Sequence, residues 1–349
     1  MTIEPKLYTP PLFLKQGLLM TLYIAFGANR KWEKTIKEPE PPYFSQIFTG
    51  AQDIPIFGRV AIPKNPKGTI IGTYGITGTL ENQWILRILG RKAFAAGYGV
   101  VLFDWRGHGK TGQLSPTLLS DGLYEGKDFI KITAQAKQMG CPSPFWFTGY
   151  SLGGQLALWG IKETENIPLE LGLDESEIGG AAVICPNLDS DRTLSFLVND
   201  FWGKYLEKAI ANGLKQLAWD IYHHHPKDID PVAIERIKSI REFDRELIIK
   251  SLGFSSVEEY YAASCPLPLL KDLKKPTLIL YAADDPLFAP SIIPDLQIAC
   301  EDNSLIDLRI TRYGGHVGYI SSRSCQRLHQ DPDCWWGWNR ILEWINNNE

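Results

Sequence analysis

The chain has 349 residues, of which 44% are hydrophobic and 22% charged, so it is long enough to bury a sizeable core and has a globular composition. Its formal net charge of −4 excludes the overall positive field that gathers nucleic acid, and we expect no nucleic-acid partner. Its six cysteines show no C-x-x-C spacing, which argues against a zinc site or a redox pair and favours reduced thiols in a cytoplasmic protein.

Residues 1–42 form the first predicted unit, an N-terminal extension with one apolar helix. The apolar stretch at residues 17–27 is shorter than the roughly 20 residues that span a membrane, and no small-residue cleavage signature with a basic start accompanies it. We therefore expect a buried helix, or a helix that leans on a membrane and gives the protein a peripheral membrane contact. The run EPEPP at residues 38–42 breaks regular structure and ends the extension.

Beyond the extension, buried apolar stretches alternate with helical ones, which predicts an α/β core at residues 43–185 and 276–349. The alternation is typical of a mostly parallel central sheet with helices on both faces. The expected strands are 69–73, 99–103, 144–148, 181–185, 277–281 and 306–310, with two shorter strand-like stretches between residues 43 and 62. The expected helices are 81–96, 120–139, 152–163, 290–300 and 332–346.

The interval 186–275 has helical periodicity without strand alternation and is too long for a simple crossover, so we interpret it as an inserted helical cap. Its aromatic side chains either line an apolar pocket or pack the cap onto the core. They are Phe196, Phe201, Trp202, Tyr205, Trp219 and Tyr222. The three adjacent histidines at 223–225 point in different directions, so we expect a solvated helix end there and no metal site.

The sharpest motif is GYSLGG at residues 149–154, which follows an apolar strand and precedes a helical run. This G-x-S-x-G pattern is typical of the α/β-hydrolase fold, in which a tight strand-to-helix turn exposes a nucleophilic serine. Glycines two residues before and after the serine let the chain double back. The helix N-terminus favours the negative charge that develops there. We therefore predict that Ser151 is a nucleophile.

A serine hydroxyl is a poor nucleophile near neutral pH and requires a base, which in turn is oriented by an acid. His316, in YGGH after the last predicted strand, is the expected base, and Asp285, in ADDP after the preceding strand, is the expected acid. Both follow the carboxyl ends of strands, where ligands bind in open α/β sheets. Asp284 stays open as the alternative acid, with a turn-forming role for whichever aspartate is not used.

Two further loops surround this predicted site. The oxyanion hole is expected to use the backbone N–H groups of Leu152 and Ile76, the latter in the glycine-rich loop YGITG after strand 69–73. The segment DWRGHG at residues 104–109 follows another strand. We expect its Asp and Arg to connect loops beneath the site without direct catalysis.

Besides GYSLGG, the sequence resembles the bacterial YheT-type esterases and their eukaryotic abhydrolase-domain relatives. The matching segments are KQGLLMT at 15–21, REFD at 241–244, GF through EYY at 253–261, KPTLIL and DDP at 275–286, and GGHVG at 314–318. The resemblance implies an α/β-hydrolase with a helical lid, a Ser151–Asp285–His316 triad and carboxylic esters as substrates, and it favours Asp285 over Asp284. Two departures are Tyr74-Gly75, where relatives usually carry His-Gly, and the segment 106–109.

The predicted function is a serine hydrolase that cleaves short- to medium-chain acyl esters or lipids through an acyl-enzyme, with no metal and no organic cofactor. The same triad would serve an acyltransferase, a thioesterase, an amidase or an aminopeptidase. A different class of function is a non-catalytic ligand-binding protein on the same fold, and the intact triad argues against it. A peripheral lipid-handling enzyme is a third interpretation. The oligomeric state and the substrate are not predicted by these residues.

Overall fold

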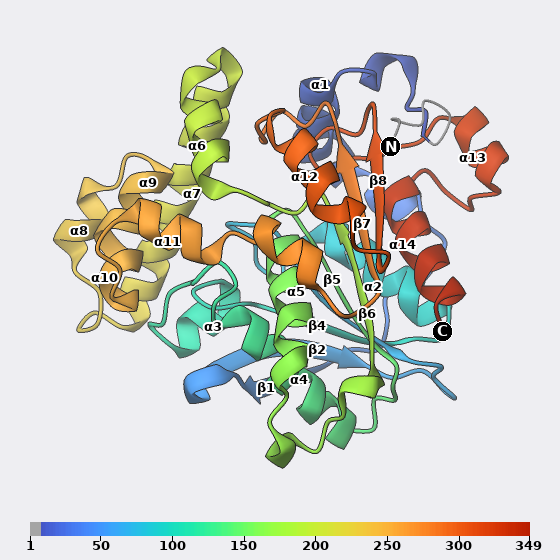
Figure 1. Cartoon of the computed structure of the whole chain (residues 1–349), viewed down its shortest axis with the longest axis horizontal. Helices are drawn as coiled ribbons and strands as arrows, with labels where there is room; N and C mark the ends of the chain where they lie inside the picture. The colour runs from blue at the N-terminus through green and yellow to red at the C-terminus, as the bar shows by residue number, and fades with distance from the viewer. Residues whose placement is uncertain (1–7) are drawn as a thin grey trace.

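The computed structural model describes residues 8–349, and the first seven residues of the expected extension lie outside the described part. An eight-stranded sheet with the order β1-β2-β4-β3-β5-β6-β7-β8 forms the centre of these residues (Figure 1). The strands are β1 (Phe44–Thr49), β2 (Pro55–Ala61), β3 (Thr69–Thr73), β4 (Gly99–Phe103), β5 (Phe145–Tyr150), β6 (Ile178–Ile184), β7 (Thr277–Ala282) and β8 (Ile306–Thr311). Strand β2 runs antiparallel to β1 and β4, and the pairings from β4 to β8 are parallel. The predicted mostly parallel α/β sheet is confirmed.

Strand β5 shows how the two faces of the sheet are covered. Successive strand residues point to opposite faces. Trp146 contacts Trp344 at 5.8 Å between ring centroids, whereas the adjacent Phe147 contacts Phe129 at 5.0 Å. Because Trp344 belongs to α14 (Trp336–Asn347) and Phe129 to α4 (Glu125–Gln138), these helices lie on opposite faces. Helix α2 (Trp84–Ala95) packs beside α14, and α5 (Leu152–Glu163) packs beside α4. The other core helices are α3 (Gly109–Leu114), α12 (Ile292–Glu301) and α13 (Arg323–His329).

The predicted helices are present: α5 has its predicted bounds, and the other four begin two to five residues later than predicted. Helix α4 begins at Glu125 and not near residue 120, because the Glu125 carboxylate accepts the N–H groups of Ser120 and Gly122 and holds them in a turn. Helix α2 begins at Trp84 because Thr79 and Asn82 form a hydrogen-bonded turn before it.

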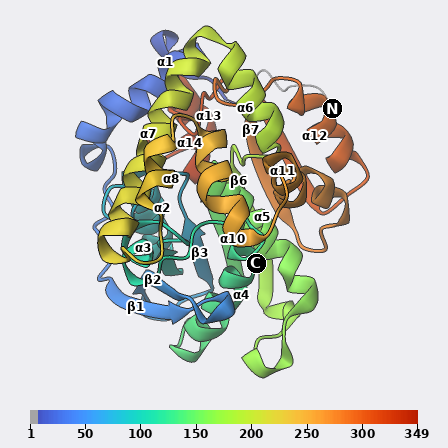
Figure 2. The ribbon, with the colours of Figure 1, turned by 90° about the vertical axis from the view of Figure 1, so that its left-hand side faces the viewer.

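Between β6 and β7 the chain is helical and contains no strand. The helices are α6 (Ser190–Asn199), α7 (Phe201–His224), α8 (Pro231–Arg236), α9 (Ile240–Phe243), α10 (Ile249–Leu252) and α11 (Val257–Ser264), with a π-helical turn at Asp244–Ile248. Side chains cap the N-termini of five of them, and such caps fix where a helix begins. The capping residues are Asp189, Asp200, Asp230, Ser239 and Ser256. Figures 1 and 2 show these helices as a layer beside the sheet.

The apolar N-terminal segment is split into α1 (Gly17–Leu22) and a π-helical turn at Tyr23–Gly27. Met20 is fully buried and Ile24 nearly so, so one side of the segment packs on the core. Among residues 8–349, no helix is long and apolar enough to cross a bilayer.

Candidate active site

Ser151 lies at the sharp turn between β5 and α5. Its backbone has φ 55° and ψ −129°, a region that non-glycine residues rarely adopt and that stores strain at functional sites. The turn requires its glycines. A Cβ at Gly149 would lie 2.2 Å from the carbonyl oxygen of Gly153, and a Cβ at Gly153 would lie 2.4 Å from that of Tyr74. The hydroxyl of Ser151 is therefore presented at the N-terminus of α5.

A continuous hydrogen-bonded chain joins Ser151 to His316 and Asp285. The Ser151 Oγ lies 2.9 Å from His316 Nε2, and His316 Nδ1 lies 2.8 Å from Asp285 Oδ2. The other oxygen of Asp285 accepts the N–H of Leu287 at 2.9 Å, which fixes the carboxylate. Only 2% of the Asp285 side chain is exposed and 12% of that of His316, so little water competes for these bonds. With Nδ1 as the donor to Asp285, Nε2 is free to accept the serine proton.

Asp284 has a different place. Its Oδ1 accepts the N–H of Gly315 at 2.9 Å, and its Oδ2 is buried without a hydrogen-bond partner. Burial raises the pKa of Asp284 to about 6. Asp284 thus supports the loop that carries His316, whereas Asp285 contacts the imidazole itself.

The two predicted oxyanion residues flank the serine. Leu152 is the first residue of α5, so its N–H has no partner within the helix, and the N–H of Ile76 has no acceptor among residues 8–349. Both residues line the cavity that contains Ser151. A Cβ at Gly75 would lie 3.0 Å from the Cβ of Ser151, so this loop passes close to the serine because Gly75 has no side chain.

The two sequence departures from the relatives meet beneath this loop. Tyr74 is fully buried and donates to Asp104, which also accepts the N–H of Leu80 at 2.8 Å. His108 Nε2 accepts the N–H of Thr77 at 3.1 Å, while its Nδ1 lies 3.0 Å from the carbonyl oxygen of Arg106. Burial lowers the pKa of His108 to about 3, so the ring stays neutral and keeps its acceptor. Tyr74 and His108 therefore support the loop that carries Ile76 together.

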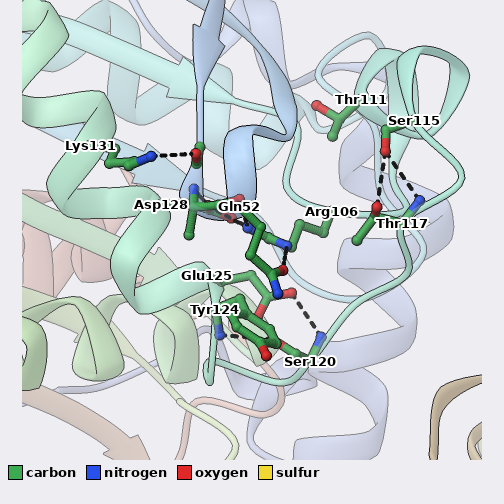
Figure 3. Close-up of polar contacts among 12 residues, drawn as sticks. Gln52, Arg106, Thr111, Ser115, Thr117, Ser120, Tyr124, Glu125, Asp128 and Lys131 are labelled. Carbon is green, nitrogen blue, oxygen red and sulfur yellow. Dashed lines mark hydrogen bonds and ion pairs between the residues drawn. The ribbon is translucent and has the colours of Figure 1, made fainter. Parts of the chain in front are cut away.

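Arg106 does not line the cavity, and Figure 3 shows it beside Gln52 and Asp128. Its guanidinium makes two hydrogen bonds to Asp128, of 2.7 and 2.9 Å, and donates to Gln52 and to the carbonyl oxygen of Ala51. Arg106 and Asp128 are fully buried, so removing either partner would leave an uncompensated charge. These contacts join the loop after β4 to α4 and to the turn between β1 and β2.

A cavity of about 390 Å³ opens at Ser151 and His316. The cap lines it with six apolar side chains, namely Leu194, Leu197, Ile210, Leu214, Ile240 and Phe243. It also contributes the polar residues Asn187, Ser190, Thr193, Asp244 and Tyr261. None of the six aromatic cap residues singled out in the sequence lines the cavity, so of the two alternatives for them the pocket lining is wrong. Phe196, Trp219 and Tyr222 pack against the core, whereas Phe201, Trp202 and Tyr205 are exposed near the start of α7.

A pair of acidic side chains also lines this cavity, and sequence reasoning missed it. Burial raises the pKa of Asp244 to about 7, although the residue accepts the hydroxyl of Tyr261 at 2.5 Å. Burial and the neighbouring Asp244 charge raise the pKa of Asp121, whose Oδ1 has no hydrogen-bond partner. The cavity is thus largely apolar, with this acidic pair and several uncharged polar side chains in its wall.

The N-terminal segment contributes a second group of missed residues. The hydroxyl of Thr21 accepts the N–H of His316 at 2.8 Å, and Thr21, Ile24 and Ala25 line the cavity. A Cβ at Gly17 would lie 1.7 Å from the carbonyl oxygen of Asp284, so α1 approaches the Asp284 loop at backbone distance. The match at KQGLLMT was the available signal, because it includes Gly17 and Thr21.

Comparison with protein families shows where this arrangement belongs. The model of the family described as the alpha/beta hydrolase fold matches residues 68–322, more than half of the chain. The chain belongs to the α/β-hydrolase family. The matched region contains β3 to β8, the inserted helices, and all three residues of the Ser151–His316–Asp285 chain.

Curated relatives agree with this membership. A Synechocystis sp. protein named "Putative esterase" is 51% identical over 97% of this chain and 94% of its own length. Human phospholipase ABHD3 is 26% identical, and the match covers 72% of this chain and 58% of that protein. The Escherichia coli esterase-named protein YheT is 29% identical over 58% of this chain and 55% of its own length. These relatives support hydrolase activity for this α/β-hydrolase.

Solved structures show the same fold at low identity. An esterase of Pyrococcus furiosus has a TM-score of 0.52 at 17% identity, and the match covers 87% of this chain and 92% of that one. The structure of DcsB with a substrate analogue has a TM-score of 0.55 at 15% identity, and the match covers 88% of this chain and 100% of that one.

Proposed function

We propose that this α/β-hydrolase is a serine esterase that cleaves carboxylic esters through an acyl-enzyme on Ser151. The observation that carries the proposal is the unbroken hydrogen-bonded chain from Ser151 through His316 to Asp285, which opens into a largely apolar cavity. Such a chain is the arrangement that activates a serine hydroxyl for attack on a carbonyl carbon.

The reaction follows from these contacts. His316 Nε2 takes the hydroxyl proton as Ser151 Oγ bonds to the ester carbonyl carbon, and Asp285 stabilises the resulting imidazolium. The N–H groups of Leu152 and Ile76 stabilise the oxyanion. His316 then donates its proton to the departing alcohol. Water, deprotonated by the same imidazole, attacks the acyl-enzyme carbonyl carbon. His316 then returns that proton to Ser151 Oγ as the acid is released. No step requires a metal or organic cofactor.

The walls of the cavity favour an apolar acyl group of short or medium length. Aliphatic side chains from α6, α7 and α9 bound the space around the serine, and about 390 Å³ accommodates a single ligand of modest size. The substrate class we propose is therefore small-molecule acyl esters or lipid esters.

The test is hydrolysis of p-nitrophenyl esters of increasing acyl length by the parent protein and by Ser151→Ala. We expect turnover by the parent with an optimum at a short or medium chain. We expect no turnover above background by the variant at unchanged melting temperature. A parent that hydrolyses no ester of the series, or a variant that retains full activity, would contradict the proposal.

A further inference from the structure

Two groups of exposed apolar side chains border the catalytic cavity. The N-terminal group consists of Leu12, Phe13, Leu19, Tyr23 and Phe26. The cap group consists of Val198, Phe201, Trp202 and Tyr205, at the junction of α6 and α7. Phe13 and Phe26 are 65% and 68% exposed, and Phe201 and Trp202 are 65% and 54% exposed. Exposed apolar clusters of this kind mark interaction sites.

The two groups lie on the same end of the molecule, with the cavity between their elements. Figures 1 and 2 both show α1 and the junction of α6 and α7 projecting from that end. Ile24 and Ala25, beside the N-terminal group, line the cavity, and so does Leu197 beside the cap group. We call this surface, formed by the two groups, the docking face.

The docking face carries excess positive charge on a chain that is acidic overall. Exposed basic residues accompany both groups, and none forms an ion pair within residues 8–349. They are Lys15, Arg30, Lys31, Lys34, Lys204 and Lys208. Of the nearby acids, Glu33 pairs with Arg87 and Arg91. The Asp200 and Glu207 carboxylates accept backbone N–H groups and keep their charge, but the six basic residues outnumber them.

We infer that the docking face binds the surface of an anionic phospholipid bilayer. Exposed aromatic rings insert at the level of the headgroups, and flanking lysines and arginines are attracted to anionic lipid. Unpaired cations around both apolar groups match an anionic lipid surface, whereas a contact with a second protein chain would not require them. The inference rests on the proposed function and deepens it. If the docking face binds a bilayer, the cavity opens next to the membrane, and the substrate is an ester of a membrane lipid.

Flotation of the full chain with vesicles tests the binding separately from catalysis. We expect the parent and Ser151→Ala to float equally with phosphatidylcholine–phosphatidylglycerol vesicles. Less protein should float with phosphatidylcholine alone or at high salt. Replacing Phe13 and Phe26 by serine, or Phe201 and Trp202 by serine, should lower partitioning about tenfold or more, since each pair loses two inserted aromatic side chains.

A matched control removes exposed apolar side chains elsewhere, by Ile47→Ser and Leu169→Ser, which are 53% and 95% exposed, and should leave flotation unchanged. All eleven tryptophans lie within residues 8–349, and Trp202 is the only one of them whose side chain is more than half exposed. Brominated phospholipid should therefore quench fluorescence in the parent but not in Trp202→Phe.

The inference is overturned if the parent stays in the soluble fraction with both vesicle types, or if the docking-face variants float as well as the parent. Self-association that both serine pairs abolish, without vesicle binding, would assign the face to a second copy instead. Because Ser151→Ala serves as a binding-competent reference, failed flotation and failed hydrolysis are distinguishable.

Discussion

At the scale of single residues, two adjacent aspartates have different environments. Asp285 accepts from the imidazole of His316, whereas Asp284 accepts a backbone N–H of the same loop. The sequence places both after β7 but cannot choose between them by spacing, because a one-residue shift points a side chain in another direction. The family resemblance favoured the residue that contacts the imidazole.

Asp285→Asn should lower kcat by about 10⁴-fold, because an amide at this position permits the wrong tautomer of His316. Asp284→Asn is the matched control, since its amide oxygen can still accept the N–H of Gly315, and we expect kcat within about tenfold of the parent. Steady-state ester hydrolysis measures both. Equal losses in the two variants would contradict these roles.

Thr21 positions the loop of His316 from the other end of the chain. Thr21→Val removes the acceptor for the N–H of His316 and should lower kcat about tenfold with little change in KM, because an unsatisfied buried donor costs about 1–3 kcal/mol. Thr21→Ser retains the acceptor and should restore most of kcat. A serine variant as impaired as the valine variant would show that the hydrogen bond alone does not support the loop, which would contradict this role of Thr21.

At the scale of helices and strands, the central strands β3 to β7 could be predicted because they lack charged residues and are buried on both faces of the sheet. The lining of the cavity could not be predicted, because it depends on which face of each cap helix turns inward. Leu194 and Leu197, and Ile210 and Leu214, have the three- and four-residue spacing of an inward stripe. The larger Phe201 and Trp202 lie at the start of α7, where Asp200 caps the helix, and project outward.

The acidic pair links the cap to the core and makes stability depend on pH. Asp244 keeps its proton up to about pH 7 in the folded protein. In the unfolded chain an aspartate releases it near pH 3.9. The folded state therefore binds more protons in this window, and the free energy of unfolding falls as pH rises from about 4 to 7.

Asp244→Asn should lessen that fall by an amount on the order of a few kcal/mol, since it removes one of the two shifted carboxyl groups. Urea unfolding of the parent and the variant measures the difference at two pH values: pH 5, where folded Asp244 still holds its proton, and pH 8, where both states have released it. A variant whose stability falls as steeply as that of the parent would contradict the assignment to Asp244.

At the scale of the whole molecule, the N-terminal segment is part of the catalytic cavity. Its contact with the His316 loop joins residues 295 positions apart, and no local pattern in the sequence encodes such a pairing. Local patterns do encode the strand-turn-helix around Ser151, which is why few residues were enough to propose Ser151 as the nucleophile. Long-range packing decides the rest of the site.

A chain that begins at Pro41 should consequently lose most of its esterase activity and several kcal/mol of stability. It lacks the buried Met20, Ile24 and Trp32, each of which contributes about 1.5–3 kcal/mol by burial, and the support from Thr21. Thermal unfolding and ester hydrolysis measure the two effects. A truncated chain with the activity and melting temperature of the parent would make the segment dispensable.

The central claim is that Ser151 is activated by His316, and fluorophosphonate labelling followed by mass spectrometry of the peptides tests it most directly. The account predicts a single phosphonyl adduct on the peptide that contains Ser151, absent in Ser151→Ala and strongly slowed in His316→Ala. An intact parent protein that takes up no adduct, or carries it on another residue, would contradict the account.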